Sequence, residues 1–176
     1  CLLSRGLGDV YKRQNPATVT ADGWVQAGVE VYGGPLLNSW LDRELRFAGR
    51  LALDDGTQVL AATGPVGRIP QLAIHLDREV NEGLTLKRQR HTNPVVGALA
   101  PRGEDAGEAE ADGLTARVPG DVLTALAAAA GVDPAAVRGH DVVVADAQAP
   151  GLFGLAGEFF ASGRLDNLSS VHAGLV

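Results

Sequence analysis

The chain has 176 residues, 45% of them hydrophobic and 20% charged, a balance that is typical of a globular protein and excludes a disordered one. Its formal net charge of -6 at pH 7 argues against nucleic-acid binding, because contacts to phosphates need a basic face. The single cysteine excludes a disulfide framework and a cysteine-based zinc module, and no apolar run approaches the roughly 20 residues that cross a bilayer, so we expect a soluble protein of a reducing compartment.

Residues 1–14 differ in composition from the rest of the chain. They hold three of the 15 basic residues, one of the 21 acids and the only cysteine, without a signal-peptide centre or an initiator methionine. We interpret them as translated adaptor or vector sequence and exclude them from the fold; a native N-terminal strand is the alternative. At the other end, residues 167–176 have the pattern of a helix that stops abruptly. The sequence therefore predicts a fragment of a longer protein.

The first half of the native-like chain has the alternation and the turn residues of short antiparallel strands. The sequence Asp54-Asp55-Gly56-Thr57 is a strong hairpin signal. We expect strands at residues 24–32, 46–53, 58–62 and 69–76, and in the first of them Val25, Ala27, Val29 and Val31 share one face.

An acidic stretch and two helices are expected next. Residues 101–112 contain five acids and one arginine, which indicates a solvated loop that is disordered over 102–112; an acidic docking tail is the alternative. Residues 121–130 have the pattern of a helix that ends at Gly131. Asp133-Pro134 then caps a second, short helix.

The character of the chain changes near Arg138. The apolar run at 140–145 predicts a strand buried on both faces, as in a parallel sheet. Residues 163–167 turn into the last helix. We therefore expect an antiparallel β-rich unit followed by part of an open α/β sheet.

The sequence lacks the motifs that reveal chemistry by spacing alone. It has no phosphate-binding glycine loop, no His-Glu-x-x-His and no nucleophile elbow. The histidines are scattered, at positions 75, 91, 140 and 172. Composition and spacing thus indicate only a soluble α/β fragment with a β-rich portion.

Four sequence blocks carry a resemblance that goes further. They are VEVYGG with WLDREL and AGR (29–50), IPQLAIHLDR with NE (69–82), DAQAP (146–150) and SGRLDNL (162–168). In order and content they resemble the aspartyl aminopeptidase family of two-zinc metallopeptidases, over essentially all of residues 15–176. The second and fourth blocks are the most specific, and the third departs from the usual Asp-Thr-Gln-Pro-Ala.

The resemblance implies a fold class and a domain organisation. The family has a doubly wound α/β catalytic domain with a β-rich insert, which forms the subunit interface and roofs the active site. Residues 15–23 would leave the catalytic domain, residues 24–137 would form this dimerisation and lid domain, and residues 138–176 would return to a truncated catalytic domain. The implied assembly is a homo-oligomer through the insert.

Asp166 carries the zinc argument. In the family, the aspartate of Arg-Leu-Asp-Asn bridges two zinc ions, and a carboxylate suits this role because each oxygen can take one metal of a pair about 3.5–4 Å apart. A helix N-cap is the alternative for Asp166. Asp146 and Asn167 would support the metal ligands by hydrogen bonding. The alternatives are a strand-end acid facing solvent for Asp146 and a residue that only shapes the turn for Asn167.

His75 is the second expected site residue. The matching histidine in the family reaches from the insert into the partner subunit's active site, where it contacts the substrate carbonyl and the oxyanion that forms on it. The alternative is a structural histidine in an apolar strand. Asp42 and Arg43, beside Trp40, are expected to order the insert.

The resemblance implies a zinc aminopeptidase that removes N-terminal residues, acidic ones (Asp or Glu) above all, from peptides in the cytoplasm. The catalytic glutamate and the other zinc ligands of the family lie outside this chain, so we expect the fragment itself to be inactive. Nucleic acid and membranes are not expected partners. A non-catalytic, β-rich oligomerisation module is the alternative function.

Overall fold

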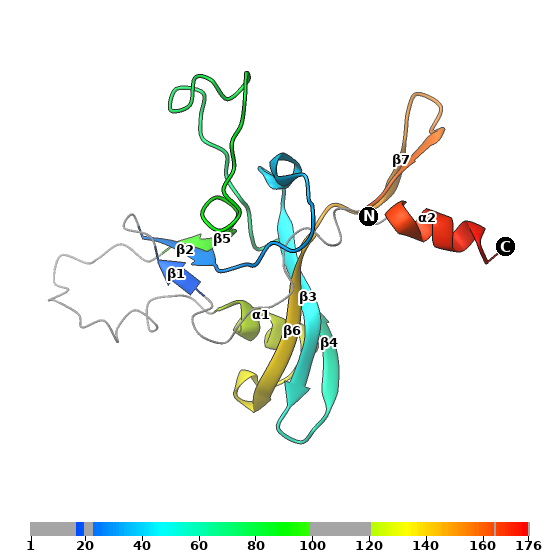
Figure 1. The fold of residues 1–176 in the computed structure, drawn as a ribbon. Coiled ribbons are helices and arrows are strands. Elements are labelled where there is room, and N and C mark those ends of the chain that lie inside the picture. The colour runs from blue at the N-terminus through cyan, green and yellow to red at the C-terminus, as the bar shows by residue number, and fades with distance from the viewer. Residues whose placement is uncertain (1–16, 20–22, 99–120, 164, 176) are drawn as a thin grey trace, which may run out of the picture.

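The structure is a computed structural model that describes residues 17–19, 23–98, 121–163 and 165–175. The described residues form a small α/β fold whose strands pair into antiparallel sheets, drawn in Figure 1. One sheet has the order β1-β2-β5, the second β4-β3-β6, and the third is the β7-β8 hairpin. The strands are β1 (Ala17–Val19), β2 (Trp24–Ala27), β3 (Leu45–Leu53), β4 (Gln58–Ala62), β5 (Val95–Ala98), β6 (Val137–Asp146), β7 (Gly151–Phe153) and β8 (Phe159–Ala161). The helices are α1 (Val122–Ala130), α2 (Leu165–Ala173) and the short 3-10 helices η2 (Leu37–Trp40) and η4 (Pro134–Ala136).

The sheet β4-β3-β6 is the centre of the fold. Leu45, Phe47 and Leu51 of β3 alternate along the strand and are buried, as its period-two pattern predicts. The predicted hairpin at residues 54–57 is confirmed: the carboxylate of Asp55 accepts a hydrogen bond from the Thr57 N–H at 2.8 Å, which holds the turn between β3 and β4.

The predicted helix at 121–130 is also confirmed. The Asp121 carboxylate caps its N-terminus by accepting from the Thr124 N–H at 2.7 Å. Gly131 ends it in the left-handed conformation, with φ 69°. Helix α1 packs against the central sheet, and Val122, Leu126 and Ala127 join the core with side chains of β2, β3, β4 and β6 and with Trp40 and Ile69.

Two of the expected strands differ from the structure. The strand expected at 24–32 ends at Ala27, although Val29 and Val31 still pack against the core. The strand expected at 69–76 is wrong, because only Ile69 forms a bridge, to Leu41, before Pro70. Pro70 lacks an N–H to continue the ladder, and its successors turn away from the sheet.

The expectation for residues 140–145 is wrong as well. Strand β6 runs antiparallel to β3, from Val137 opposite Leu53 to Asp146 opposite Leu45. Val142 and Val144 are buried while their neighbours are not, so one face of the strand is covered rather than both. The apolar run therefore belongs to the edge of the β-rich sheet and not to a parallel one.

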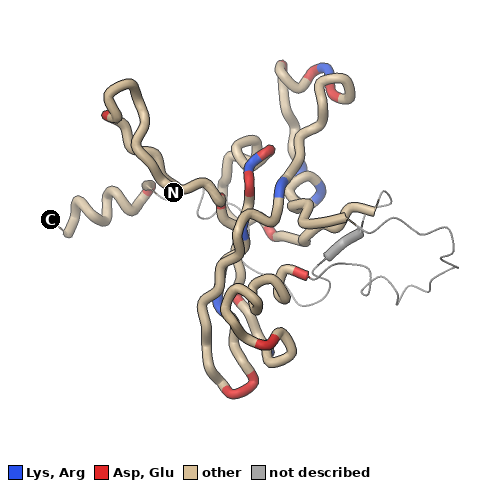
Figure 2. Tube along the Cα trace, turned by 180° about the vertical axis from the view of Figure 1, so that it is seen from behind, with Lys and Arg blue, Asp and Glu red and all other residues tan. Residues whose placement is uncertain are grey.

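Two parts of the chain project from this body. The first is the arm, which we define as residues 71–91; it is the long green excursion in Figure 1 and carries both acidic and basic residues (Figure 2). The second consists of the β7-β8 hairpin and α2, whose described side chains are exposed throughout. In both views the arm and α2 extend in different directions.

The segments expected to be foreign (1–14) and disordered (102–112) lie outside the described residues. Within the described part of the chain, every helix is too short or too polar to cross a membrane.

Candidate functional site

His75 lies on the arm, in a turn rather than in a strand. The Leu76 N–H donates to the carbonyl oxygen of Ala73 at 2.8 Å, and the Asp77 N–H donates to the same oxygen at 3.3 Å. The His75 side chain is exposed, and so are those of Ile74 and Leu76 beside it. The structure therefore places this histidine on a projecting surface and not in the core.

The base of the arm is held by Asp42, which lies in a bend of the chain just after the buried Trp40. Asp42 adopts a left-handed backbone conformation, with φ 55°. Its N–H donates to the Ile69 carbonyl oxygen at 2.9 Å, and its carboxylate accepts from the Gln71 N–H at 3.2 Å. The expectation that Asp42 orders the β-rich unit thus has a structural counterpart at the start of the arm.

Arg43, the next residue after this bend, forms an ion pair with Asp146. The Arg43 Nη1 donates to Oδ2 of Asp146, with 34% and 24% of the two side chains exposed. The other carboxylate oxygen of Asp146 accepts from the Gln148 N–H at 3.0 Å. Within the described residues, the partners of the Asp146 carboxylate are thus Arg43 and the Gln148 N–H.

Asp166 lies between strand β8 and the regular part of helix α2. Its backbone is extended, with φ -89° and ψ 112°, and the peptide bond to Asn167 is cis. Its side chain is exposed and accepts no hydrogen bond from the described residues. The helix-cap interpretation is thus not supported, since a cap accepts from an N–H two or three positions onward.

The structure does not bring the expected site residues together. His75 is on the arm, Asp146 is at the end of β6, and Asp166 and Asn167 begin α2 on the other projection. No group of three or more His, Cys, Asp or Glu side chains within the described residues could hold a metal ion. The described residues therefore do not form a zinc site by themselves, and Asp166 offers a single carboxylate toward one.

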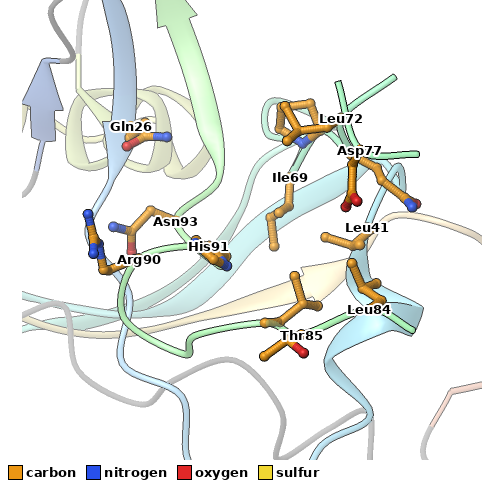
Figure 3. Close-up of a pocket in the computed structure, with 13 residues that line it drawn as sticks. Gln26, Leu41, Ile69, Leu72, Asp77, Leu84, Thr85, Arg90, His91 and Asn93 are labelled. Carbon is orange, nitrogen blue, oxygen red and sulfur yellow. The ribbon is translucent and has the colours of Figure 1, made fainter. Parts of the chain in front are cut away.

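A cavity of about 300 Å³ lies where the arm joins the body. Figure 3 shows the apolar side chains of Leu41, Ile69 and Leu84 on one side of it and those of Arg90, His91 and Asn93 on the other. His91 accepts from the Lys87 N–H through Nδ1 at 3.2 Å, which folds the returning limb of the arm into a turn. Sequence reasoning missed this cavity, because its lining residues are scattered along the chain from Gln26 to Asn93.

Comparison with known proteins shows which family this chain matches. Residues 11–176 match the model of a family described as Aminopeptidase I zinc metalloprotease (M18). This match begins inside the segment 1–14 that we expect to be foreign.

Curated relatives carry the same family name. The chain is 46% identical over 156 residues to the probable M18 family aminopeptidase 2 of Streptomyces avermitilis, covering 88% of this chain and 33% of the relative. It is 34% identical over 169 residues to the protein of that name from Clostridium novyi, covering 93% of this chain and 36% of the relative. The chain thus spans about a third of the length of these curated relatives.

Solved structures also contain chains with a similar fold. A chain in the cryo-EM structure of the Ape4 and Nbr1 complex has a TM-score of 0.73 and 32% identity, over 94% of this chain and 32% of the other. A chain of the S. cerevisiae mApe1 dodecamer has a TM-score of 0.61 and 26% identity, over 94% of this chain and 34% of the other.

Proposed function

Because the chain belongs to the M18 family of zinc metalloproteases, we propose that the whole protein is a metallo-aminopeptidase, a hydrolase that removes N-terminal residues from peptides. The observation that carries this proposal is the family match over residues 11–176, together with relatives named aminopeptidases. We further propose that its preferred N-terminal residues are acidic and that it acts in the cytoplasm.

The proposed organisation is a doubly wound catalytic domain that carries the β-rich unit as an insert. The pairing of β6 with β3 argues that the insert extends through Asp146, rather than ending at residue 137. The β7-β8 hairpin and α2 would then belong to the catalytic domain, together with residues 15–23. The Arg43–Asp146 ion pair would mark the boundary between the two.

We propose that Asp166 is the residue of this chain that bridges two zinc ions. Its exposed carboxylate, which accepts no hydrogen bond from the described residues, supports this role. When bound, paired zinc ions polarise a peptide carbonyl and lower the pKa of a shared water molecule. Asn167 would set the direction of the chain after this ligand.

The role proposed for His75 is to contact the substrate in the partner subunit. The arm projects from the body with His75 exposed on it, and structures similar to this chain include a dodecamer, so a homo-oligomer through the insert can bring the arm to a neighbouring site. The imidazole would donate a hydrogen bond to the scissile carbonyl oxygen, where negative charge grows in the transition state.

The test is the activity of the complete protein on peptides that differ only in their first residue. We expect release of N-terminal Asp and Glu to be faster than release of Leu or Ala, and we expect a zinc chelator to abolish all of it. Equal rates would contradict the acidic preference alone. No release from any peptide by zinc-loaded protein would favour the non-catalytic oligomerisation module.

A further inference from the structure

The arm leaves the core of the molecule at a well-defined point. Ile69 is 2% exposed and forms a bridge with Leu41, so the chain is fixed up to this residue. Pro70 follows and has no N–H to donate. From Gln71 onward the backbone turns away from the sheet, and His75 lies four residues further on.

Asp42 binds the chain on both sides of Pro70. Its backbone N–H donates to the carbonyl oxygen of Ile69 at 2.9 Å, and its carboxylate accepts from the N–H of Gln71 at 3.2 Å. Within the described residues, this second bond is the last hydrogen bond that joins the outgoing limb to the body before His75.

Backbone hydrogen bonds hold the base of the arm on both limbs. Arg68 and Val95 exchange backbone hydrogen bonds of 3.0 and 2.8 Å, and the Ala27 N–H donates to Pro94 at 2.9 Å. This pairing fixes the chain before Ile69 as well as after Pro94. Beyond it, the Gln71 N–H, at the start of the limb that carries His75, is bonded to the Asp42 side chain. The direction in which the arm sets out is therefore sensitive to Asp42.

The residue type at position 42 is suited to this task. A φ of 55° lies in the left-handed region, which Asp and Asn tolerate better than other side chains with a Cβ atom. The residues on either side hold the bend at Asp42 in place, since Trp40 is buried and Arg43 pairs with Asp146. Asp42 itself is exposed, and among the described residues its carboxylate accepts a hydrogen bond from the Gln71 amide alone.

We propose that Asp42 is a positioning residue that aims His75 at the substrate. This inference rests on the proposed function of His75 in a metallo-aminopeptidase. Asp42 touches neither substrate nor metal in this assignment; it acts only by fixing the start of the limb that carries the histidine. A small error in direction at Gln71 would displace the imidazole, and misplacing a reacting or stabilising group by about 1 Å can cost about 10²-fold in rate.

The test uses three variants of the complete protein and their combination. Asp42→Gly keeps the left-handed backbone accessible but removes the acceptor, and Asp42→Asn keeps both the backbone preference and an acceptor oxygen. We expect Asp42→Gly to lower kcat about 10–100-fold with little change in KM, zinc content or melting temperature. Asp42→Asn should restore nearly all of the activity, and the Gln71 amide should exchange faster only in Asp42→Gly.

His75→Ala separates this inference from the function on which it rests. If Asp42 acts through His75, Asp42→Gly should cost nothing further in the His75→Ala background. Two results would overturn the positioning role of Asp42 while leaving the role of His75 intact. One is an equal loss of kcat on Asp42→Gly in the wild type and in His75→Ala. The other is full activity of Asp42→Gly when His75→Ala is impaired. Full activity of His75→Ala would overturn the proposed role of the histidine and this inference with it.

Discussion

Gly49, near the centre of β3, is a residue that the sheet accepts only without a side chain. It pairs with Val142 of β6, and a Cβ atom at this position would press on the carbonyl oxygen of Asp141 and lie 2.7 Å from the Val142 Cα. The neighbouring backbone is held by the β3-β6 ladder and cannot yield locally. The close approach of the two strands therefore depends on this glycine.

We predict that Gly49→Ala destabilises the protein by about 1–3 kcal/mol, because the added methyl group overpacks a strand pair. The free energy of unfolding in urea measures the effect. Gly64→Ala is the matched control, since a Cβ atom there meets nothing within 4 Å. Equal stability of the two variants would contradict the close approach that the structure shows.

Asp55 gives the hairpin a dependence on pH. The hydrogen bond from the Thr57 backbone N–H lowers the pKa of the Asp55 carboxyl below its ordinary value of 3.8. A carboxyl whose folded-state pKa is lowered adds stability above its unfolded pKa and loses it as pH falls through the folded value. The contribution of Asp55 should therefore be present at neutral pH, begin to fall near pH 3.8 and be lost as the pH falls further through the lowered folded-state pKa.

The measurement is the free energy of unfolding of the wild type and of Asp55→Ala between pH 7 and pH 2. We predict that the difference between the two is constant near neutral pH and shrinks in acid. Asp55→Asn keeps an acceptor oxygen without a titrating group, so its difference from Asp55→Ala should not change with pH. A difference that stays constant into acid for the wild type would contradict the assigned cause.

The elements that the sequence predicts correctly are those with local causes. The β3-β4 hairpin follows from Asp54–Thr57, and α1 follows from an aspartate cap and a terminal glycine, all of which act within a few residues. The interpretations of 69–76 and 140–145 fail because their causes are distant. The apolar side chains of the first lie on an exposed arm, and the second pairs antiparallel with β3.

In the candidate site, too, local features could be predicted from the sequence and contacts between distant residues could not. That Asp166 precedes the regular turns of a helix could be expected from the turn residues around it. The pairing of Arg43 with Asp146 could not, because the two are 103 positions apart and no periodicity links them. The same holds for Asp42 and Gln71, whose bond depends on the path of the chain between them.

The Arg43–Asp146 ion pair joins the start of β3 to the end of β6, so it should stabilise the sheet more than an exposed pair does. We predict a coupling energy of about 1 kcal/mol in a double-mutant cycle with Arg43→Ala and Asp146→Ala. The control is Arg138 with Asp54, which lie 3.5 Å apart with 58% and 52% of their side chains exposed. Their coupling should be close to zero, and a similar value for both pairs would contradict the assignment.

At the scale of the whole molecule, the β7-β8 hairpin and α2 leave apolar side chains exposed. Leu152, Phe153, Phe159 and Phe160 of the β7-β8 hairpin are more than half exposed, and α2 buries none of its described side chains. A two-stranded hairpin is marginally stable by itself in water. These apolar surfaces are consistent with the proposed place of the hairpin and α2 in a larger catalytic domain.

We predict that the 176-residue chain alone binds no zinc tightly and has no aminopeptidase activity. Asp166 offers one carboxylate, and no group of three or more metal-binding side chains lies within the described residues. Calorimetric titration of zinc into the purified chain, with a peptidase assay beside it, tests this. Tight binding of two zinc ions per chain would contradict the assignment of Asp166 as the one zinc ligand that this chain supplies.

The assembly itself can be tested through His75 and Asp166, because the proposal places them in active sites that combine two subunits. We predict that His75→Ala lowers kcat about 10²–10³-fold, the usual effect of losing one donor to an oxyanion, with zinc content and folding unchanged. Asp166→Ala should lose both zinc and activity. Each variant alone is then inactive for a different reason.

Mixing the two variants distinguishes action between subunits from action within one. In a mixed oligomer, a subunit with His75→Ala still holds its zinc ligands, and the intact His75 of an Asp166→Ala neighbour can reach them. Differently tagged subunits, purified through both tags, should therefore regain part of the wild-type activity. If verified mixed oligomers recover nothing, His75 acts on the zinc site of its own chain, and the arm is not the element that completes a neighbouring active site.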